Sequence, residues 1–125
     1  MTENEISYEI RGAIFDVYNN LGPGLLESAY EAALGFELGR RGLFYARQVP
    51  LSMQYESIRL DVCYRLDFLV EDKVIIELKS VETLLNVHHK QLITYLKLSG
   101  VKLGILVNFN TDEIAKSIFR KVNGF

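Results

Sequence analysis

Apolar side chains recur at the spacing of one helical face near the start of the chain. Between residues 3 and 20 they stand at Ile6, Ile10, Ala13, Ile14 and Val17, which predicts an amphipathic helix with one buried face. The sequence LGPG at 21–24 is expected to end this helix and begin another, because glycine caps helix C-termini and proline restarts the chain. A second helix is predicted from about residue 25 to residue 41, with Gly42 as its stop.

The middle of the chain changes to β-branched and aromatic residues. Residues 43–55 and 58–70 are predicted strands with a turn near residues 56–58, and residues 74–81 form a third. Short connections favour an antiparallel arrangement of consecutive strands. The three strands are therefore expected to form an antiparallel meander.

The last third of the chain alternates between helical and strand patterns. Residues 82–100 predict a helix ending at Gly100, and the nearly all-apolar residues 101–109 predict a strand inside a sheet. This helix is long enough to cross over, so the last strand is expected to lie parallel to a neighbour. Residues 110–125 predict a closing amphipathic helix, capped by Asn110 or Thr111. The predicted fold class is α/β (α+β), with helices flanking a mixed four-stranded sheet in αβββαβ order.

Composition narrows the class of protein. The chain has 125 residues, of which 49% are apolar and 24% charged, as in one globular domain. We expect a single domain over residues 1–125, with the helix of residues 1–21 packed on its core. No apolar run approaches the ~20 residues of a membrane span, and the acidic, amphipathic start differs from a signal peptide. A cytoplasmic location without membrane contact is expected.

Charge and cysteine content exclude further classes. Cys63 is the only cysteine, which excludes an internal disulfide and a cysteine-built zinc site; it is expected to be a small buried strand residue. The net charge of −2 excludes bulk electrostatic coating of nucleic acid, so such contact requires a local basic patch. The adjacent His88 and His89 point about 100° apart on a helix, which disfavours a shared metal.

Charged residues interrupt the most β-prone segment, YRLDFLVEDKVIIELKSV at 64–81. Alternation places Glu77 and Lys79 on one face of their strand, about 6–7 Å apart. If residues 71–73 form a three-residue loop, Val70 pairs with Val74 and Asp67 falls opposite Glu77, with Cβ atoms about 5 Å apart. A slip of one residue would send Asp67 to the other face. The predicted site depends on this register.

Two carboxylates this close repel each other and lose hydration when partly buried. A divalent cation removes the conflict, and Mg²⁺ prefers oxygen ligands. A metal also acidifies a bound water, which Lys79 is placed to orient while stabilising charge on a phosphate. The combination favours hydrolysis of a phosphodiester. The alternative is that Lys79 forms a salt bridge with Asp67 or Glu77 on a solvated face, although VIIELK is apolar apart from that charged pair.

These residues resemble a known family. Asp67 followed by Glu77-Leu78-Lys79 resembles the D…(D/E)-x-K signature of the PD-(D/E)XK nuclease superfamily, whose restriction-endonuclease-like core has the predicted element order. The sequence GLLESAY at 24–30 is similar to the motif of the GxxExxY protein family. Similar blocks extend the resemblance over roughly residues 8–122: RQVPL, YRLDFLVEDKVIIELKSVE, HHKQLITYLKLSG and LGILVNFN.

The resemblance implies a role for each matching residue. Asp67 and Glu77 would bind Mg²⁺ or Mn²⁺ with the Leu78 carbonyl, and Lys79 would be the catalytic lysine. Glu27 would be an additional acidic residue directed at the metal.

Gln91 and Tyr95 match the Q-x-x-x-Y element and would support the site or bind substrate, with core or capping roles as the alternative. His88, one turn before Gln91, could share their face. Tyr30, one turn beyond Glu27, would support the site, with packing or a hydrogen bond to Glu27 as the alternative.

The sequence departs from the family pattern at two positions and leaves two functions open. Leu66 precedes Asp67 where proline is common, and Lys90 precedes Gln91 where a small residue is expected. The implied function is a metal-dependent nuclease that cleaves DNA or RNA. The alternative is a catalytically silent scaffold of the same fold that binds nucleic acid or a protein. In either case we expect a homodimer or action beside a protein partner.

Overall fold

A mixed sheet forms the centre of the molecule. The computed structural model of the chain describes residues 1–124, without the side chains of residues 61–63, so the expected burial of Cys63 lies outside the described residues. The sheet has five strands in the order β1-β2-β3-β4-β5: β1 Tyr45–Tyr55, β2 Ile58–Val70, β3 Val74–Lys79, β4 Leu103–Asn108 and β5 Ile118–Val122. The expected meander and the parallel β3–β4 pair are present, but the prediction of four strands was wrong.

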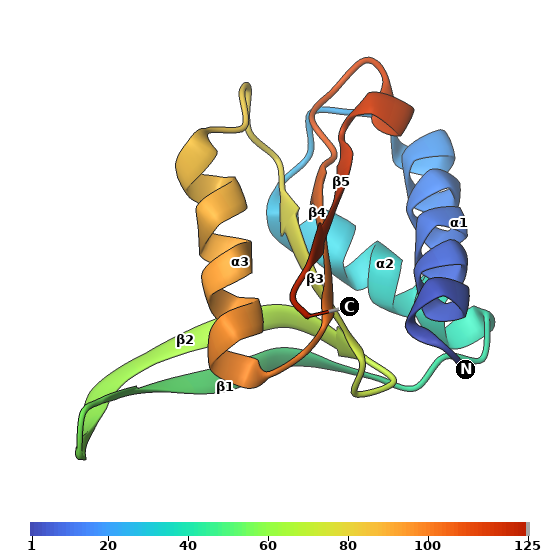
Figure 1. Ribbon diagram of the computed structural model, residues 1–125. Helices are drawn as coiled ribbons and strands as arrows, with labels where there is room; N and C mark the ends of the chain where they lie inside the picture. The colour runs from blue at the N-terminus through green and yellow to red at the C-terminus, as the bar shows by residue number, and fades with distance from the viewer. Residues whose placement is uncertain (125) are drawn as a thin grey trace.

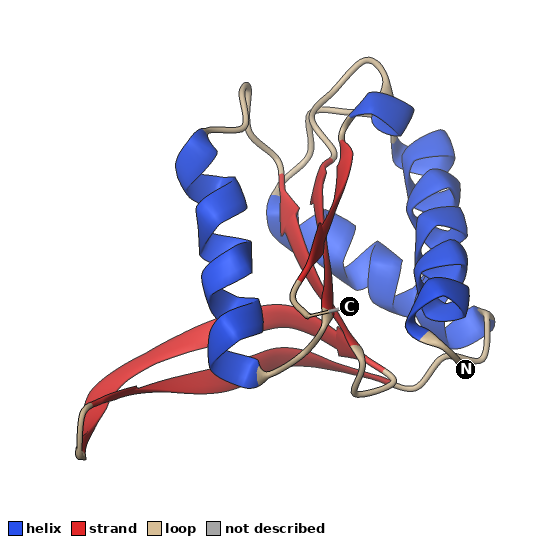
Figure 2. Cartoon of the chain, viewed as in Figure 1, coloured by secondary structure: helices blue, strands red, loops and turns tan. Residues whose placement is uncertain are grey.

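Helices cover both faces of this sheet (Figure 1, Figure 2). Helices α1 (Glu3–Leu21) and α2 (Glu27–Arg40) lie on one face, and α3 (Asn86–Ser99) lies on the other. Alternation along β3 sends Ile76 and Leu78 into the core under α1 and α2, and Ile75 into the core under α3. Within the described residues, none of these helices has the length and apolarity that crossing a membrane requires.

Helix α1 begins with reciprocal capping. The backbone N–H of Glu5 donates to Thr2 Oγ1 at 3.1 Å, and the backbone N–H of Thr2 donates to Glu5 Oε1 at 2.9 Å. This arrangement satisfies two N–H groups that a helix start otherwise leaves unpaired. The apolar face predicted for this helix is buried, at Ile6, Ile10, Ala13, Ile14 and Val17.

The end of the chain is a strand, and the prediction of a helix over residues 110–125 was wrong. A short 3₁₀ turn, η1 (Ile114–Lys116), precedes β5, which pairs antiparallel with β4. Ile114, Ile118 and Val122 stand four residues apart, which mimics a helical face. As a strand, the segment pairs the outer backbone groups of β4 and packs Ile118 and Phe119 into the cores on opposite faces of the sheet. As a helix, the segment could pack its apolar side chains against only one face of the sheet.

Strands β2 and β3 separate after three residue pairs. Val70 pairs with Val74, Leu69 with Ile75 and Phe68 with Ile76, which confirms the predicted register. Beyond these pairs, β2 leaves the sheet with β1 as a two-stranded ribbon that extends past α3 (Figure 1). We call the point of separation the strand fork. Asp67 on β2 and Glu77 on β3 lie next to the last pair, Phe68 with Ile76, on the side where the strands separate.

Gly104 on β4 allows α3 to approach the sheet closely. A Cβ atom at this position would lie 2.8 Å from Cδ1 and 3.0 Å from Cγ of the buried Leu92. Gly104→Ala is therefore expected to lower the free energy of unfolding by about 1–3 kcal/mol through overpacking. Chemical denaturation measures this loss. In a Leu92→Val background the loss should shrink, and an equal loss in both backgrounds would contradict this contact as its cause.

Candidate functional site

The two carboxyl groups replace the missing backbone pairing at the strand fork. The backbone N–H of Asp67 donates to Glu77 Oε1 at 3.2 Å, and the backbone N–H of Leu78 donates to Asp67 Oδ2 at 2.9 Å. Each carboxylate thus accepts from the backbone of the opposite strand, where a regular ladder would have used carbonyl groups. The geometry brings Asp67 and Glu77 together as the hairpin register predicted.

Burial makes this pair electrostatically unfavourable. Glu77 is only 4% exposed, and burial, followed by repulsion from Asp67 and the hydrogen bond between the two carboxyl groups, raises its pKa to about 9. Burial also raises the pKa of Asp67, although the Leu78 N–H, the bond to Glu77 and the charge of Lys79 act in the opposite direction. Burial and mutual repulsion therefore oppose the ionisation of both carboxyl groups at once.

Lys79 lies at the end of β3, two residues beyond Glu77. Its side chain is half-buried and forms no ion pair with any side chain that the structure describes. The backbone around it is held on both sides, since the N–H of Phe109 donates to the Lys79 carbonyl at 2.9 Å and Ser80 Oγ donates to the Leu25 carbonyl at 2.5 Å. Lys79 is thus a cation near the carboxyl pair on a fixed strand end.

A small cavity opens beside Asp67 on the α2 side of the fork. Its volume is about 210 Å³, and it is lined by Glu27, Ser28, Glu31, Gln48, Asp67 and Leu78. Glu27, the additional acidic residue that the resemblance implies, is exposed and lines this cavity. Glu31 was missed, although it stands four residues after Glu27 on the same helical face. Its charge also raises the pKa of Asp67.

The donor set at the fork suits a hard divalent cation. Asp67, Glu77 and the Leu78 backbone offer oxygen ligands, which Mg²⁺ and Mn²⁺ prefer. A bound cation would offset the repulsion between the two carboxyl groups. The structure brings only two of the expected carboxylates into direct contact. Among the described residues, no three Asp, Glu, His or Cys side chains converge as a metal-binding cluster. Glu27 and Glu31 stand apart from the pair, along the cavity.

Tyr95 of the Q-x-x-x-Y element lies on α3 near the carboxyl pair, and Gln91 forms a hydrogen bond with it. Tyr95 is buried and packs against Tyr64, with ring centroids 5.6 Å apart. Burial, followed by the nearby charges of Glu77 and Asp67, raises the pKa of Tyr95 to about 12, while a hydrogen bond with Gln91 acts against this. Tyr95 is therefore a neutral hydroxyl close to the site, with Gln91 as its partner.

His88 and Tyr30 make contacts that shape the backbone. His88 Nδ1 accepts from the Leu85 backbone N–H at 3.0 Å at the start of α3. The Tyr30 hydroxyl donates to the Gly22 carbonyl at 2.6 Å and accepts from the Leu25 N–H at 3.2 Å. The Tyr30 ring stacks on Phe109 with centroids 4.5 Å apart. Tyr30 thereby fixes the loop that leads into α2 and Glu27.

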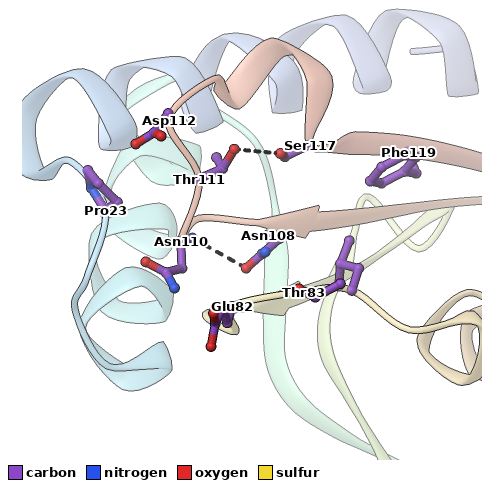
Figure 3. Close-up of a pocket in the computed structure, with 10 residues that line it drawn as sticks. Pro23, Glu82, Thr83, Asn108, Asn110, Thr111, Asp112, Ser117 and Phe119 are labelled. Carbon is purple, nitrogen blue, oxygen red and sulfur yellow. Dashed lines mark hydrogen bonds between the residues drawn. The ribbon is translucent and has the colours of Figure 1, made fainter.

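A wider cavity, of about 540 Å³, lies beyond the carboxyl ends of β3 and β4 and contains none of the predicted site residues (Figure 3). On its wall, the buried Asn108 clamps the segment after Lys79: Nδ2 donates to the Val81 carbonyl at 2.9 Å, and Oδ1 accepts from the Val81 N–H at 3.1 Å. Oδ1 also accepts from the Asn110 N–H at 3.3 Å. Sequence reasoning missed this clamp; its signal was a polar residue at the end of an apolar strand.

Removing the Asn108 clamp is expected to destabilise the protein. Asn108→Ala leaves the N–H and carbonyl of Val81 without these partners in a partly buried segment, and should lower the free energy of unfolding by about 1–3 kcal/mol. Denaturant titration measures the change. Asn20→Ala, which removes one exposed bond to the Asp16 carbonyl, is the control and should cost less than about 0.5 kcal/mol. Equal losses would contradict a clamping role for Asn108.

The fold is that of a nuclease superfamily. The PD-(D/E)XK nuclease superfamily profile matches residues 4–121, so the chain belongs to that superfamily. The crystal structure of SSO0001 has a similar fold, with a TM-score of 0.53 and 20% sequence identity over 96% of this chain and 66% of that one. This chain thus spans just under two thirds of that protein's length. No curated protein matches the chain.

Proposed function

We propose that this protein is a metal-dependent nuclease that hydrolyses phosphodiester bonds of DNA or RNA. The observation that carries the proposal is the buried Asp67–Glu77 pair at the strand fork, with Lys79 two residues away on the same strand. Uncharged amide side chains could accept the same two backbone N–H groups, so these backbone contacts alone do not explain why two mutually repelling carboxyl groups are buried here. Superfamily membership supports a nuclease fold, and the motif at residues 24–30 supports placement in the GxxExxY family.

Asp67, Glu77 and the Leu78 carbonyl would hold Mg²⁺ or Mn²⁺, with Glu27 contributing from α2. The ion would acidify water and offset phosphate charge. Lys79 would donate to a non-bridging phosphate oxygen and orient the attacking water. The water oxygen would bond to phosphorus as the bond to the leaving oxygen breaks in line, giving a phosphate monoester and a free hydroxyl. Gln91 and Tyr95 would support the site as uncharged hydrogen-bonding groups.

Cleavage of end-labelled single- and double-stranded DNA and RNA tests this function. The wild-type chain should cut at least one substrate with Mg²⁺ or Mn²⁺ and none with EDTA, and Lys79→Ala should remove the activity. Binding without cleavage under every metal condition would favour the silent scaffold. If the wild-type chain still cleaves in EDTA and the Lys79→Ala variant also still cleaves, the activity comes from a contaminant or another site, and the proposal is wrong.

A further inference from the structure

Strand β1 carries an unusual backbone conformation beside the candidate site. Arg47 pairs with Phe68 and Val49 pairs with Leu66, and between them Gln48 has a φ of +52°. A non-glycine residue in this left-handed region is strained and persists only when surrounding contacts hold it. Such irregularities in a strand re-aim side chains and concentrate near functional sites. Here Gln48 lies opposite Asp67 on the neighbouring strand β2, between these two pairs.

The strained residue directs two consecutive side chains to one carboxylate. Arg47 NH2 donates to Glu31 Oε2 at 3.2 Å, and Gln48 Nε2 donates to Glu31 Oε1 at 2.5 Å. In a regular strand, consecutive side chains point to opposite faces, so one of these contacts would be lost. The left-handed Gln48 thus places the Arg47 guanidinium beside the cavity that Glu31, Gln48 and Asp67 line.

The cavity beside Arg47 is acidic. The side chains that line the cavity include three carboxylates and no lysine or arginine. A phosphodiester chain approaching Asp67 would meet repulsion at the α2 side of the fork, and a single metal at the carboxyl pair would offset only part of it. Among the described ion pairs, the pair of Arg47 with Glu31 is the one that includes a residue lining the cavity. The guanidinium therefore supplies the charge that a polyanionic substrate requires there.

We propose that Arg47 is a substrate-binding residue that contacts a backbone phosphate next to the one being cleaved, with Glu31 and Gln48 as the residues that position it. This assignment rests on the proposed nuclease function. The Arg47 side chain is 42% exposed, whereas that of Glu31 is 14% exposed, so the pair presents its cationic partner to solvent. Glu31 occupies one terminal nitrogen of a five-donor group, which leaves a two-donor edge for a phosphate.

Equilibrium binding of a fluorescent oligonucleotide in EDTA measures this contact without cleavage. Arg47→Ala is expected to weaken binding about 10- to 100-fold and to lower the slope of log affinity against log salt by about 1. Arg47→Lys should restore the slope while recovering only part of the affinity, because lysine keeps the charge and loses the two-donor edge. In cleavage assays Arg47→Ala should raise KM and leave kcat within about twofold.

Arg40→Ala is the matched control, because Arg40 makes a similar exposed ion pair, to Glu37 at 3.1 Å, away from the cavity lining. It should leave affinity and salt slope unchanged, and thermal unfolding should show that both variants fold. If Arg47→Ala binds as wild type, or the wild-type chain binds no nucleic acid, the proposal for Arg47 is overturned. Arg47-dependent binding without cleavage would keep this proposal while rejecting the nuclease function, so the two failures are distinguishable.

Discussion

Replacing Asp67 with asparagine is expected to remove cleavage and to raise the free energy of unfolding at the same time. Asparagine has nearly the same shape, and its Oδ1 still accepts the Leu78 N–H that Asp67 accepts at 2.9 Å. Asparagine carries no charge. Burial therefore no longer lowers the stability of the folded state as it does with the ionised Asp67, whose pKa is raised by burial. The gain should be about 1 kcal/mol or more at pH 7 in the absence of divalent metal.

Activity should move in the opposite direction. A neutral amide is a poor ligand for Mg²⁺ compared with a carboxylate, and since loss of even an outer-shell partner costs 10- to 100-fold, cleavage should fall by more than about 100-fold. Rate measurements and denaturant titration on the same preparation check both effects. A variant that is both inactive and less stable would count against a site whose charges oppose folding.

The register of the β2–β3 hairpin was predictable because local rules determine it. Val70 and Val74 flank a three-residue turn in which Glu71 and Asp72 have positive φ and the Lys73 N–H donates to the Val70 carbonyl at 3.0 Å. The apolar alternation on either side then determines which residues face each other. Both signals lie within about a dozen consecutive residues, so the positions of Asp67 and Glu77 followed from the sequence.

The parts that were missed depend on partners far along the chain. Gln48 adopts its left-handed conformation where Glu31, from α2, accepts from its side chain, and glutamine itself has no preference for that conformation. Strand β5 likewise depends on the free edge of β4, because its apolar residues four apart equally suit a helix. The sequence therefore predicts the chemistry of the carboxyl pair better than the surface that surrounds it.

Glu77 should make stability and metal binding depend on pH in opposite ways. Its pKa is about 9 in the folded protein against an ordinary value of 4.5, so the folded state holds the proton more tightly than the unfolded chain. Its contribution to stability is therefore complete below about pH 4.5 and is lost as pH rises towards 9. Over that interval the free energy of unfolding should fall by a few kcal/mol relative to Glu77→Gln, which cannot ionise.

A metal at this site must displace the same proton. The rise in melting temperature produced by Mn²⁺ should therefore grow between pH 6 and pH 9 in the wild-type chain and disappear in Glu77→Gln. Glu37→Gln is the control, because Glu37 is also buried, at 7% exposure, but pairs with Arg40 outside the site; it should keep the Mn²⁺ response. Melting curves for the three proteins, with and without Mn²⁺, measure both effects. A pH-independent response in the wild type would show that Glu77 does not exchange its proton for the metal, and would remove the electrostatic basis of the proposed site.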